Sequence, residues 1–233
     1  MNIKKTKGIV KGTEDLTPTA RVIKIKLAES VDFVAGSFVN VFININSEKV
    51  RRAYSISSSD REQDMIEISV RLNTEGKMTP EFWKNDIVGS EIEIMGPLGL
   101  NTANKMNAPK KYLFGFGIGA GVIKSLSDNF LNDPETKDIH LIFGHRNESE
   151  ILYKEYFDDI RSNNVSISYV VSNPDKELSK GLLEGYIQNH ISEYDFNNSD
   201  IYICGQEKAC DQLKELIEKT KPLGSNYFIE GFH

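Results

Sequence analysis

Cysteine is scarce in this chain of 233 residues, which contains only Cys204 and Cys210. Two thiols cannot build a disulfide framework, and they cannot hold an iron–sulfur cluster that needs four thiolates from this chain. Free thiols are typical of a reducing compartment, so we expect a cytoplasmic location. The four histidines are scattered through the second half without metal-ligand spacing, and no metal site is expected.

Long apolar runs are missing as well. No stretch approaches the roughly 18 apolar residues of a membrane-spanning helix. The lysines of residues 1–6 have no apolar segment behind them, so this start does not resemble a signal peptide. Positive charge is not in excess: the net charge of −6 argues against nucleic acid as a partner. What remains is the composition of a globular protein, long enough for two ordinary domains.

The first hundred residues alternate between apolar and polar side chains with a period of two, which is typical of half-buried strands. Six strands are expected, at residues 3–11, 21–27, 38–43, 51–57, 65–70 and 91–94. One short helix is expected at residues 80–84, after Thr79 as a possible cap. Many short strands with turn signals between them predict a six-stranded antiparallel barrel.

The second half alternates apolar strands with amphipathic helices. Strands are expected at residues 112–116, 139–143, 166–171, 201–204 and 227–230, and helices near 119–131, 148–162, 180–191 and 206–220. This order predicts a doubly wound, five-stranded parallel sheet. A polar stretch at residues 101–110 separates the halves, and we divide the chain into domains 1–104 and 105–233.

Two neighbouring features of the first half suit an anionic ligand with a flat ring. Arg52 and Tyr54 share one face of a strand, where the arginine can pair with a diphosphate and the tyrosine can lie against a ring, while the Ser55 hydroxyl can bond ring heteroatoms. An ordinary barrel strand with a surface arginine explains these residues too. A turn that opens a short helix, where backbone N–H groups favour phosphate, follows at Gly76, Lys77, Met78 and Thr79. A plain turn and cap has the same appearance.

The second half carries a glycine-rich turn directly after a strand and directly before a helix, at Gly115, Gly117 and Gly119. That context is required of a dinucleotide-binding turn, although a tight strand–helix turn also explains it. Open α/β sheets bind ligands at the carboxyl ends of their strands. Three more expected strand ends carry Arg146, Ser172, and Cys204 with Gly205. Four such ends together predict a nucleotide site.

In this order the motifs resemble those of the ferredoxin–NAD(P)H reductase superfamily of flavoproteins. The matching segments are Arg52-x-Tyr54-Ser55 for the family's R-x-Y-S, Gly76-x-x-Thr79 for its G-x-x-S/T turn, Gly96-Pro97-Leu98-Gly99 for its G-P-x-G, Gly117-Ile118-Gly119 for its nicotinamide loop, Cys204-Gly205, and Glu230-x-Phe232 near the end. The resemblance spans nearly the whole chain.

The resemblance implies an FAD-binding barrel followed by an NAD(P)-binding sheet. It implies that Arg52, Thr79 and the turn amides hold the flavin diphosphate, and that Arg71 flanks the flavin tail. The glycine turn with Cys204 and Gly205 would frame the nicotinamide, and Phe232 and His233 would lie near the flavin ring. The implied candidate catalytic residues are Tyr54 and Ser55 at the isoalloxazine, Cys204 as a packing group, and Glu230 as a proton relay or a stabiliser of partly reduced flavin.

Three departures from the family pattern stand out: Val122 and Gln206 replace prolines, and Asn173 follows Ser172 where NADPH-preferring relatives often carry arginine. The last departure favours NADH, because a 2′-phosphate needs cations. Arg146, Lys176 and Lys180 could supply them, so the choice between NADH and NADPH stays open.

The implied reaction is hydride transfer from NAD(P)H to FAD, followed by single-electron release to a ferredoxin or flavodoxin-like protein. Alternatives are the reductase component of a multicomponent oxygenase, a free flavin or ferric reductase, and a non-catalytic redox subunit. Lysines could steer an acidic partner, although solvated faces look the same; they are Lys4, Lys5, Lys7, Lys11, Lys105, Lys110 and Lys111.

Overall fold

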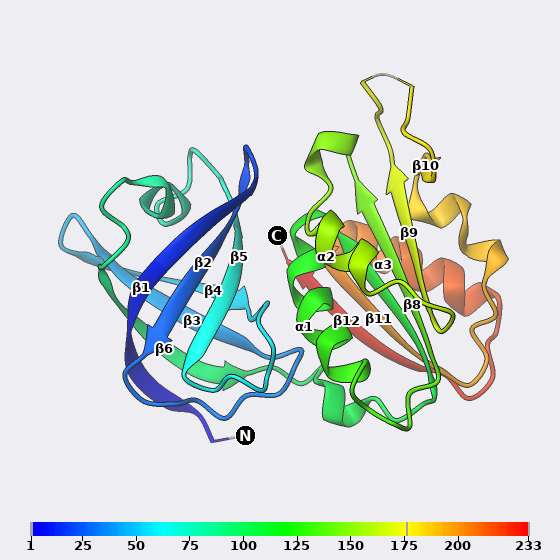
Figure 1. The fold of residues 1–233 in the computed structure, drawn as a ribbon, viewed down its shortest axis with the longest axis horizontal. Coiled ribbons are helices and arrows are strands. Elements are labelled where there is room, and N and C mark those ends of the chain that lie inside the picture. Colours follow the sequence, from blue (N-terminus) through cyan, green and yellow to red (C-terminus); the bar gives the residue numbers. More distant parts are fainter. Residues whose placement is uncertain (1, 176, 233) are drawn as a thin grey trace. The chain divides into compact units, whose positions relative to one another are not determined.

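The computed structural model describes residues 2–175 and 177–232, and the chain divides into two compact units, residues 1–103 and 104–233. This division lies one residue from the predicted one. The predicted positions of Lys176 and His233 lie outside the described residues. We describe the two units separately (Figure 1).

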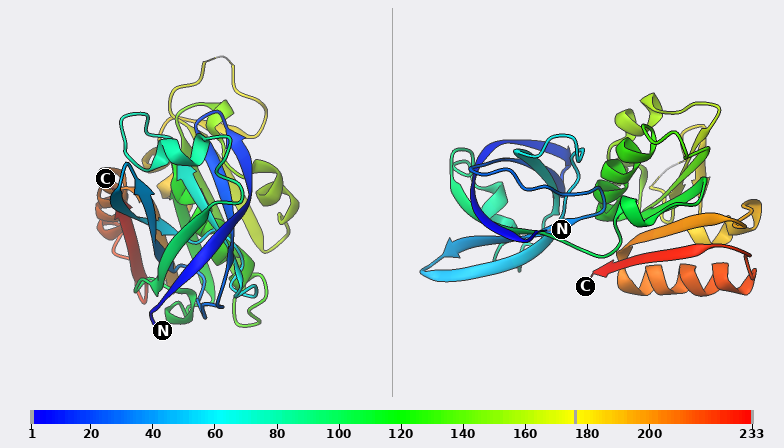
Figure 2. Two further views of the ribbon diagram at one scale, coloured as in Figure 1. Left: turned by 90° about the vertical axis from the view of Figure 1, so that its left-hand side faces the viewer. Right: turned by 90° about the horizontal axis from the view of Figure 1, so that it is seen from below.

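Unit 1 is the expected antiparallel barrel. Its strands are β1 (Lys4–Thr17), β2 (Ala20–Leu27), β3 (Phe38–Ile45), β4 (Glu48–Ser55), β5 (Met65–Arg71) and β6 (Glu91–Leu98). They follow the order β4-β3-β6-β1-β2-β5 in one strongly curved sheet (Figure 2). An antiparallel bridge between Ile56 and Ile68 links the end of β4 to β5. The two edges of the sheet therefore meet at one end.

The core of unit 1 forms because alternate strand residues point inward. Val10, Ile23, Val39, Ile66 and Ile94 are fully buried in one cluster. The expected short helix is a 3-10 turn, η1 (Thr79–Trp83), with Pro80 in its first turn and Phe82 buried. This turn packs against the same core, so it holds the preceding residues 76–78 in place.

Unit 2 is a parallel sheet with helices on both faces (Figure 2). Its strands are β7 (Lys110–Phe116), β8 (Asp138–His145), β9 (Val165–Val171), β10 (Leu182–Glu184), β11 (Ser199–Gln206) and β12 (Asn226–Phe232). Their order is β10-β9-β8-β7-β11-β12. The chain winds outward from β7 in one direction and then restarts at β11 on the other side of β7. The carboxyl ends of β7 and β11 thus form the switch point where open α/β sheets bind ligands.

The described residues form three α-helices between these strands: α1 (Ala120–Phe130), α2 (Lys154–Asp159) and α3 (Glu207–Lys219). The last helix has one apolar face, because Cys210, Leu213 and Ile217 are fully buried in the core and Leu216 packs against it half-buried. The prediction for residues 148–162 was too long. This segment instead forms a short 3-10 turn, η4 (Glu148–Glu150), followed by α2. Tyr153 between them has a left-handed backbone conformation, which interrupts a continuous helix.

The predicted helix at residues 180–191 was wrong. Gly181 and Gly185 have φ of +91° and +101°, values that no α-helix accommodates. Between them the chain forms β10, a sixth strand beside β9, and two 3-10 turns follow, η5 (Ile187–Asn189) and η6 (Ile191–Glu193). Apolar residues at helical spacing were therefore used for an edge strand and two short turns.

A buried ion pair between β7 and β11 stabilises the start of unit 2. Lys111 on β7 donates from Nζ to Asp200 Oδ2 on β11 at 2.8 Å and to the Met106 carbonyl at 2.8 Å. Asp200 also accepts from the Ala108 N–H at 2.7 Å and from Asn226 Nδ2 at 2.9 Å. Both charged side chains are almost completely buried. The segment before β7 is thereby tied to β11 and β12.

Candidate functional site

The side chains of the expected flavin motif on β4 differ in their exposure to solvent. Arg52 is exposed, and its Nη1 donates to the Arg51 carbonyl at 2.7 Å. Tyr54 is half-buried, with its ring edge-on to Phe82 at a centroid distance of 5.8 Å. Burial raises the pKa of the Tyr54 phenol well above its usual value. At neutral pH the strand therefore offers a cation, a neutral phenol and the half-buried Ser55 hydroxyl in sequence.

The turn at residues 76–79 is held by its own hydrogen bonds. The Thr79 hydroxyl accepts from the Asn73 N–H at 3.0 Å and donates to the Asn73 carbonyl at 2.9 Å. The Gly76 N–H donates to the same carbonyl at 3.0 Å. Met78 is buried, so it anchors the turn instead of facing a ligand. A preformed turn of this kind suits a diphosphate, because its backbone amides need no rearrangement.

Two further cations of the barrel are already engaged by protein groups. Lys77 Nζ lies 2.8 Å from Glu48 Oε2 at the start of β4, and both side chains are exposed. Arg71, at the end of β5, donates from Nη1 to Thr19 Oγ1 at 2.9 Å. The Lys77–Glu48 pair joins the turn to the strand that carries Arg52. The turn is therefore linked to β4, the strand on which Arg52 lies exposed.

The glycine turn of unit 2 lies against the loop after β11. A Cβ on Gly119 would overlap the Cys204 carbonyl oxygen, and one on Gly205 would lie 2.5 Å from Phe116 Cβ. Gly205 also has φ of +147°, which favours glycine. Gly115 is similarly confined, since its Cβ would lie 3.2 Å from the Ala120 N. The glycines therefore let the two loops at the switch point pack directly against each other, backbone against backbone.

The loops after β8 and β9 are joined by backbone hydrogen bonds. The Ser172 N–H donates to the His145 carbonyl at 3.0 Å, and the Asn173 N–H donates to the Arg146 carbonyl at 2.7 Å. Arg146 is exposed at this edge of the sheet. The predicted strand ends thus form one continuous rim, with Arg146 as its cation.

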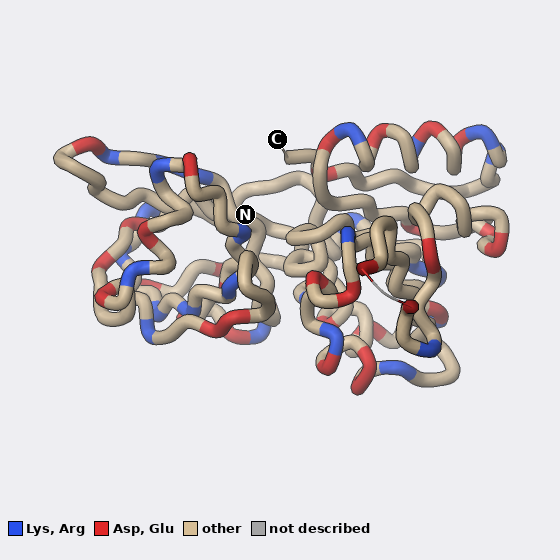
Figure 3. Tube along the Cα trace, turned by 90° about the horizontal axis from the view of Figure 1, so that it is seen from above, with Lys and Arg blue, Asp and Glu red and all other residues tan. Residues whose placement is uncertain are grey.

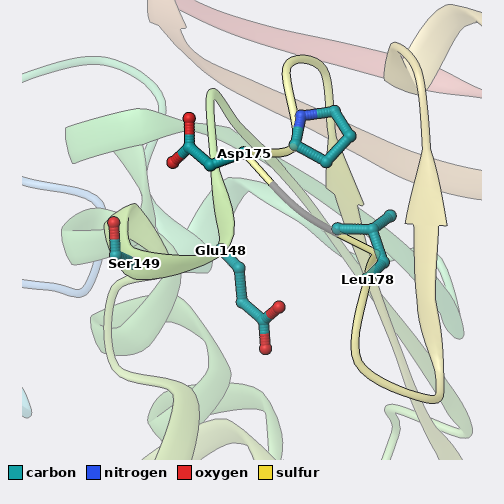
Figure 4. A pocket seen from close by; sticks show the side chains of 5 residues that line it. Glu148, Ser149, Asp175 and Leu178 are labelled. Carbon is teal, nitrogen blue, oxygen red and sulfur yellow. The ribbon is translucent and has the colours of Figure 1, made fainter.

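A cavity of about 230 Å³ opens at the same rim (Figure 4). It is lined by Glu148, Ser149, Pro174, Asp175 and Leu178. Its two carboxylates, Glu148 and Asp175, were not predicted as site residues, because they come from separate loops. The sequence feature that could have indicated this site is Asp175, an acidic residue two positions after Asn173.

A buried thiol and a half-buried carboxyl lie at the carboxyl ends of β11 and β12. Cys204 is fully buried, and burial raises the pKa of its thiol well above the usual value, so the thiol is neutral at ordinary pH. Glu230 pairs with Cys204 in the register of the two strands. Burial raises the pKa of Glu230 to about 7, against the opposing effect of a hydrogen bond from Tyr202 Oη to Glu230 Oε2 at 2.8 Å. Phe232 ends β12 and is half-buried.

The lysines expected to steer a partner are mostly engaged. Ion pairs join Lys5 to Glu93, Lys7 to Glu91, Lys110 to Asp195 and Lys111 to Asp200. Lys111 is buried, so its predicted place on a docking surface was wrong. Figure 3 shows basic and acidic residues interspersed along the barrel. A steering patch built from these lysines is therefore largely neutralised by its neighbours.

Residues 7–102 match the family of oxidoreductase FAD-binding domains, and residues 113–214 match the family of oxidoreductase NAD-binding domains. The chain belongs to the ferredoxin–NAD(P)H reductase superfamily. Its cofactors are accordingly FAD in the barrel and a nicotinamide nucleotide in the sheet. The residues present fit both groups: the barrel offers an exposed Arg52 and a preformed turn, and the sheet offers a close-packed glycine turn at its switch point.

A curated relative and two solved structures agree with this family. The reductase component DmpP of phenol 2-monooxygenase from Pseudomonas sp. strain CF600 is 26% identical over 97% of this chain, which spans 65% of that relative. A ferredoxin reductase in carbazole 1,9a-dioxygenase has a TM-score of 0.86 and 20% identity, over 100% of this chain and 70% of that one. A ferredoxin NADP+ reductase from Neisseria gonorrhoeae with bound FAD and NADP has a TM-score of 0.82 and 16% identity, over 99% of both chains. These structures confirm the predicted fold.

Within the described ranges, no group of three His, Cys, Asp or Glu side chains could hold a metal ion. None of the helices in the part of the chain that the structure describes has the length and apolar character to cross a membrane.

Proposed function

We propose that this chain passes reducing equivalents from a nicotinamide nucleotide, through FAD, to a one-electron acceptor protein of the ferredoxin or flavodoxin type. The observation that carries the proposal is the contact between the glycine turn after β7 and Cys204-Gly205 after β11. It lies at the switch point of an NAD-binding domain that follows an FAD-binding domain.

The two cofactors supply the hydride chemistry when bound, and the protein binds and orients them. Arg52 and the turn at residues 76–79 would hold the flavin diphosphate, and Tyr54 and Ser55 would contact its ring. Gly119 and Gly205 would hold the loops after β7 and β11 in close contact. The nicotinamide would bind on the surface that these loops form, where it can be aligned for transfer over about 3–3.5 Å. Cys204 would support the nicotinamide site from beneath as a buried neutral thiol, and Phe232 would lie near the flavin ring.

The test is anaerobic spectroscopy of the purified protein. It should be yellow with stoichiometric FAD, and NADH should bleach the flavin absorbance. A colourless protein after incubation with FAD, or a bound flavin that the nicotinamide leaves oxidised, would refute the proposal. Loose flavin that separates on gel filtration would support a free flavin reductase instead.

A second candidate function is the reductase component of a multicomponent oxygenase. The 26% identical relative is such a component, and this chain spans 65% of its length. Cys204 and Cys210 are both buried free thiols and cannot ligate a cluster by themselves. We therefore place the one-electron acceptor outside residues 1–233, and the free thiols favour a cytoplasmic setting. Reduction of a purified ferredoxin compared with reduction of an oxygenase component distinguishes the two functions.

We also propose that NADH is the preferred coenzyme. Glu148 and Asp175 line the cavity at the rim formed by β8 and β9 (Figure 4). The 2′-phosphate of NADPH is close to a dianion at neutral pH. At a separation of about 7 Å and an effective dielectric of about 40–80, each carboxylate would oppose it by about 1–2 kcal/mol. A ribose diol would instead find hydrogen-bond acceptors there.

The expected result is a kcat/KM at least about tenfold higher for NADH than for NADPH. The double variant Glu148→Gln/Asp175→Asn keeps similar shape and should reduce this ratio by about tenfold or more. Glu155→Gln, which removes an exposed carboxylate on α2, is the matched control and should leave the ratio unchanged. A ratio that does not respond to the double variant would contradict this coenzyme preference.

A further inference from the structure

Tyr202 is a fully buried phenol in the middle of β11. Its neighbours along the strand, Ile201 and Ile203, are apolar and completely buried. A buried hydroxyl without a partner is destabilising, so phenylalanine would be the simpler residue at a purely apolar position. The tyrosine is stabilised here by a single acidic partner from the neighbouring strand, Glu230.

The strand register explains why these two side chains meet. Cys204 pairs with Glu230 and Tyr202 pairs with Phe228 in the parallel ladder of β11 and β12. Residues two apart on a strand share a face, so Tyr202, Cys204 and Glu230 lie on the same side of the sheet. Tyr202 Oη lies 2.8 Å from Glu230 Oε2. The phenol thus reaches along the sheet toward the carboxyl ends of the strands.

The direction of this hydrogen bond is settled by the groups around it. Burial raises the pKa of the Tyr202 phenol far above its usual value, and the charge of Glu230 raises it further, so the phenol keeps its proton and donates. The thiols of Cys204 on β11 and Cys210 on α3 are neutral because their pKa values are raised. Glu207 of α3 lies against Gly231, next to Glu230. Among these described neighbours, Tyr202 is the hydrogen-bond donor to the carboxyl.

We propose that Tyr202 is a positioning residue that fixes the Glu230 carboxyl and sets the pH at which this carboxyl takes up one proton. The carboxylate accepts the phenolic hydrogen bond better than the neutral acid does, so the bond favours the charged form. Without it, burial alone would act on Glu230. Only one part of this inference rests on the proposed function, namely that Glu230 exchanges this proton during turnover.

Tyr202→Phe removes the hydroxyl and keeps the ring. The test follows the Glu230 carboxyl by ¹³C NMR in protein labelled at the glutamate side-chain carboxyl, with the signal assigned by its loss in Glu230→Gln. A hydrogen bond to a charged group corresponds to about one to two pH units, so the Glu230 midpoint should rise by about that amount. A midpoint that moves by less than about 0.2 pH unit, or that falls, overturns the inference.

Tyr112→Phe is the matched control. The Tyr112 hydroxyl donates to the Asp195 carbonyl at 2.9 Å from the adjacent strand β7 of the same sheet. This variant also removes one tyrosine hydroxyl, but its partner is a backbone group away from Glu230. The Glu230 midpoint should stay where it is in the unaltered protein. A shift equal to that of Tyr202→Phe would show that the effect is a general loss of packing and would overturn the inference.

A second measurement needs no Tyr202 variant and remains valid if Tyr202→Phe does not fold. Uniform replacement of tyrosine by 3-fluorotyrosine makes the phenol a stronger donor with little change in shape. The Glu230 midpoint should then fall, which is opposite to the shift in Tyr202→Phe. A midpoint that rises or stays constant counts against Tyr202 as the donor.

The inference and the proposed function fail in different ways. If NADH does not bleach the bound flavin but the Glu230 midpoint shifts as expected, only the proposed function is wrong. If bleaching occurs and the pH profile of its rate follows Glu230, that profile should move together with the NMR midpoint in Tyr202→Phe. If bleaching occurs and the midpoint does not respond, the positioning role is wrong and the oxidoreductase assignment stands.

Discussion

The buried pair of Lys111 and Asp200 makes the sharpest prediction about stability. Lys111→Met removes the ammonium and leaves a carboxylate that is 0% exposed in its side chain. Removing one partner of a buried ion pair typically destabilises a protein by about 3–5 kcal/mol, because the other charge stays buried. A whole domain is stable by only about 5–15 kcal/mol. Lys111→Met should therefore remove a large part of the free energy of unfolding of unit 2.

The structure also predicts how the two substitutions combine. Asp200→Asn should lower the free energy of unfolding by a similar amount, since it leaves the Lys111 ammonium buried among the Met106 carbonyl, an amide and the Phe130 ring. The double variant Lys111→Met/Asp200→Asn buries no charge at this place, and the side-chain amide oxygen that it introduces can still accept from the Ala108 N–H. Its loss should fall short of the sum of the single losses by at least about 2 kcal/mol.

Urea unfolding followed by circular dichroism at 222 nm is the appropriate assay, because all three described α-helices belong to unit 2. With a slope of about 2 kcal/mol/M, each single variant should lower the midpoint by about 1.5–2.5 M. Lys214→Met is the control: its exposed pair with Glu218 at 3.6 Å should contribute less than about 0.5 kcal/mol. Single losses that add to within about 0.5 kcal/mol in the double variant would refute the reasoning.

Two further predictions concern the site. Gly119→Ala should weaken nicotinamide binding and lower the rate of flavin reduction by about a hundredfold, because the added methyl group forces the loops after β7 and β11 apart; Gly12→Ala, which meets no atom within 4 Å, should leave the rate unchanged, and equal rates in both variants would contradict this. The folded-state pKa of Glu230 is raised to about 7 from an ordinary value of 4.5, so the folded state holds its proton more tightly than the unfolded state. Stability from this group is full below about pH 4.5 and is lost as the pH rises through about 7, by about 3 kcal/mol in total. Glu230→Gln should remove this fall between pH 5 and 8 in urea unfolding, and an unchanged pH dependence would rule Glu230 out as its source.

Most of the fold could be read from local patterns. Period-two alternation predicted the barrel strands because half of each strand faces a core, and the alternation of strands and helices predicted the parallel sheet. The errors came from competition between equally good local solutions. Residues 182, 183, 187 and 191 are apolar at a spacing that suits a helix, but the positive φ of Gly181 and Gly185 turned the segment into β10 and short 3-10 turns.

The residues of the site also differ in how far they could be predicted from local sequence. Motifs contained in a single turn, such as residues 76–79 or the glycine turn after β7, were recognisable because their function depends on neighbours in the chain. The cavity lined by Glu148 and Asp175 was not recognisable, since its residues come from two loops whose proximity follows from the order of β8 and β9.

By itself the sequence determined the two domain types, their order and the turns that suit phosphate and nicotinamide, because strand alternation, glycine placement and short motifs act over a few residues. Only the tertiary structure decided which charges are buried and which are free to act. Lys111 pairs with Asp200, which lies 89 residues away in the sequence, and Tyr202 donates a hydrogen bond to Glu230, which lies 28 residues away. The physical reason is that burial and hydrogen bonding at such distances depend on strand order and register, and these are set by the packing of the whole sheet.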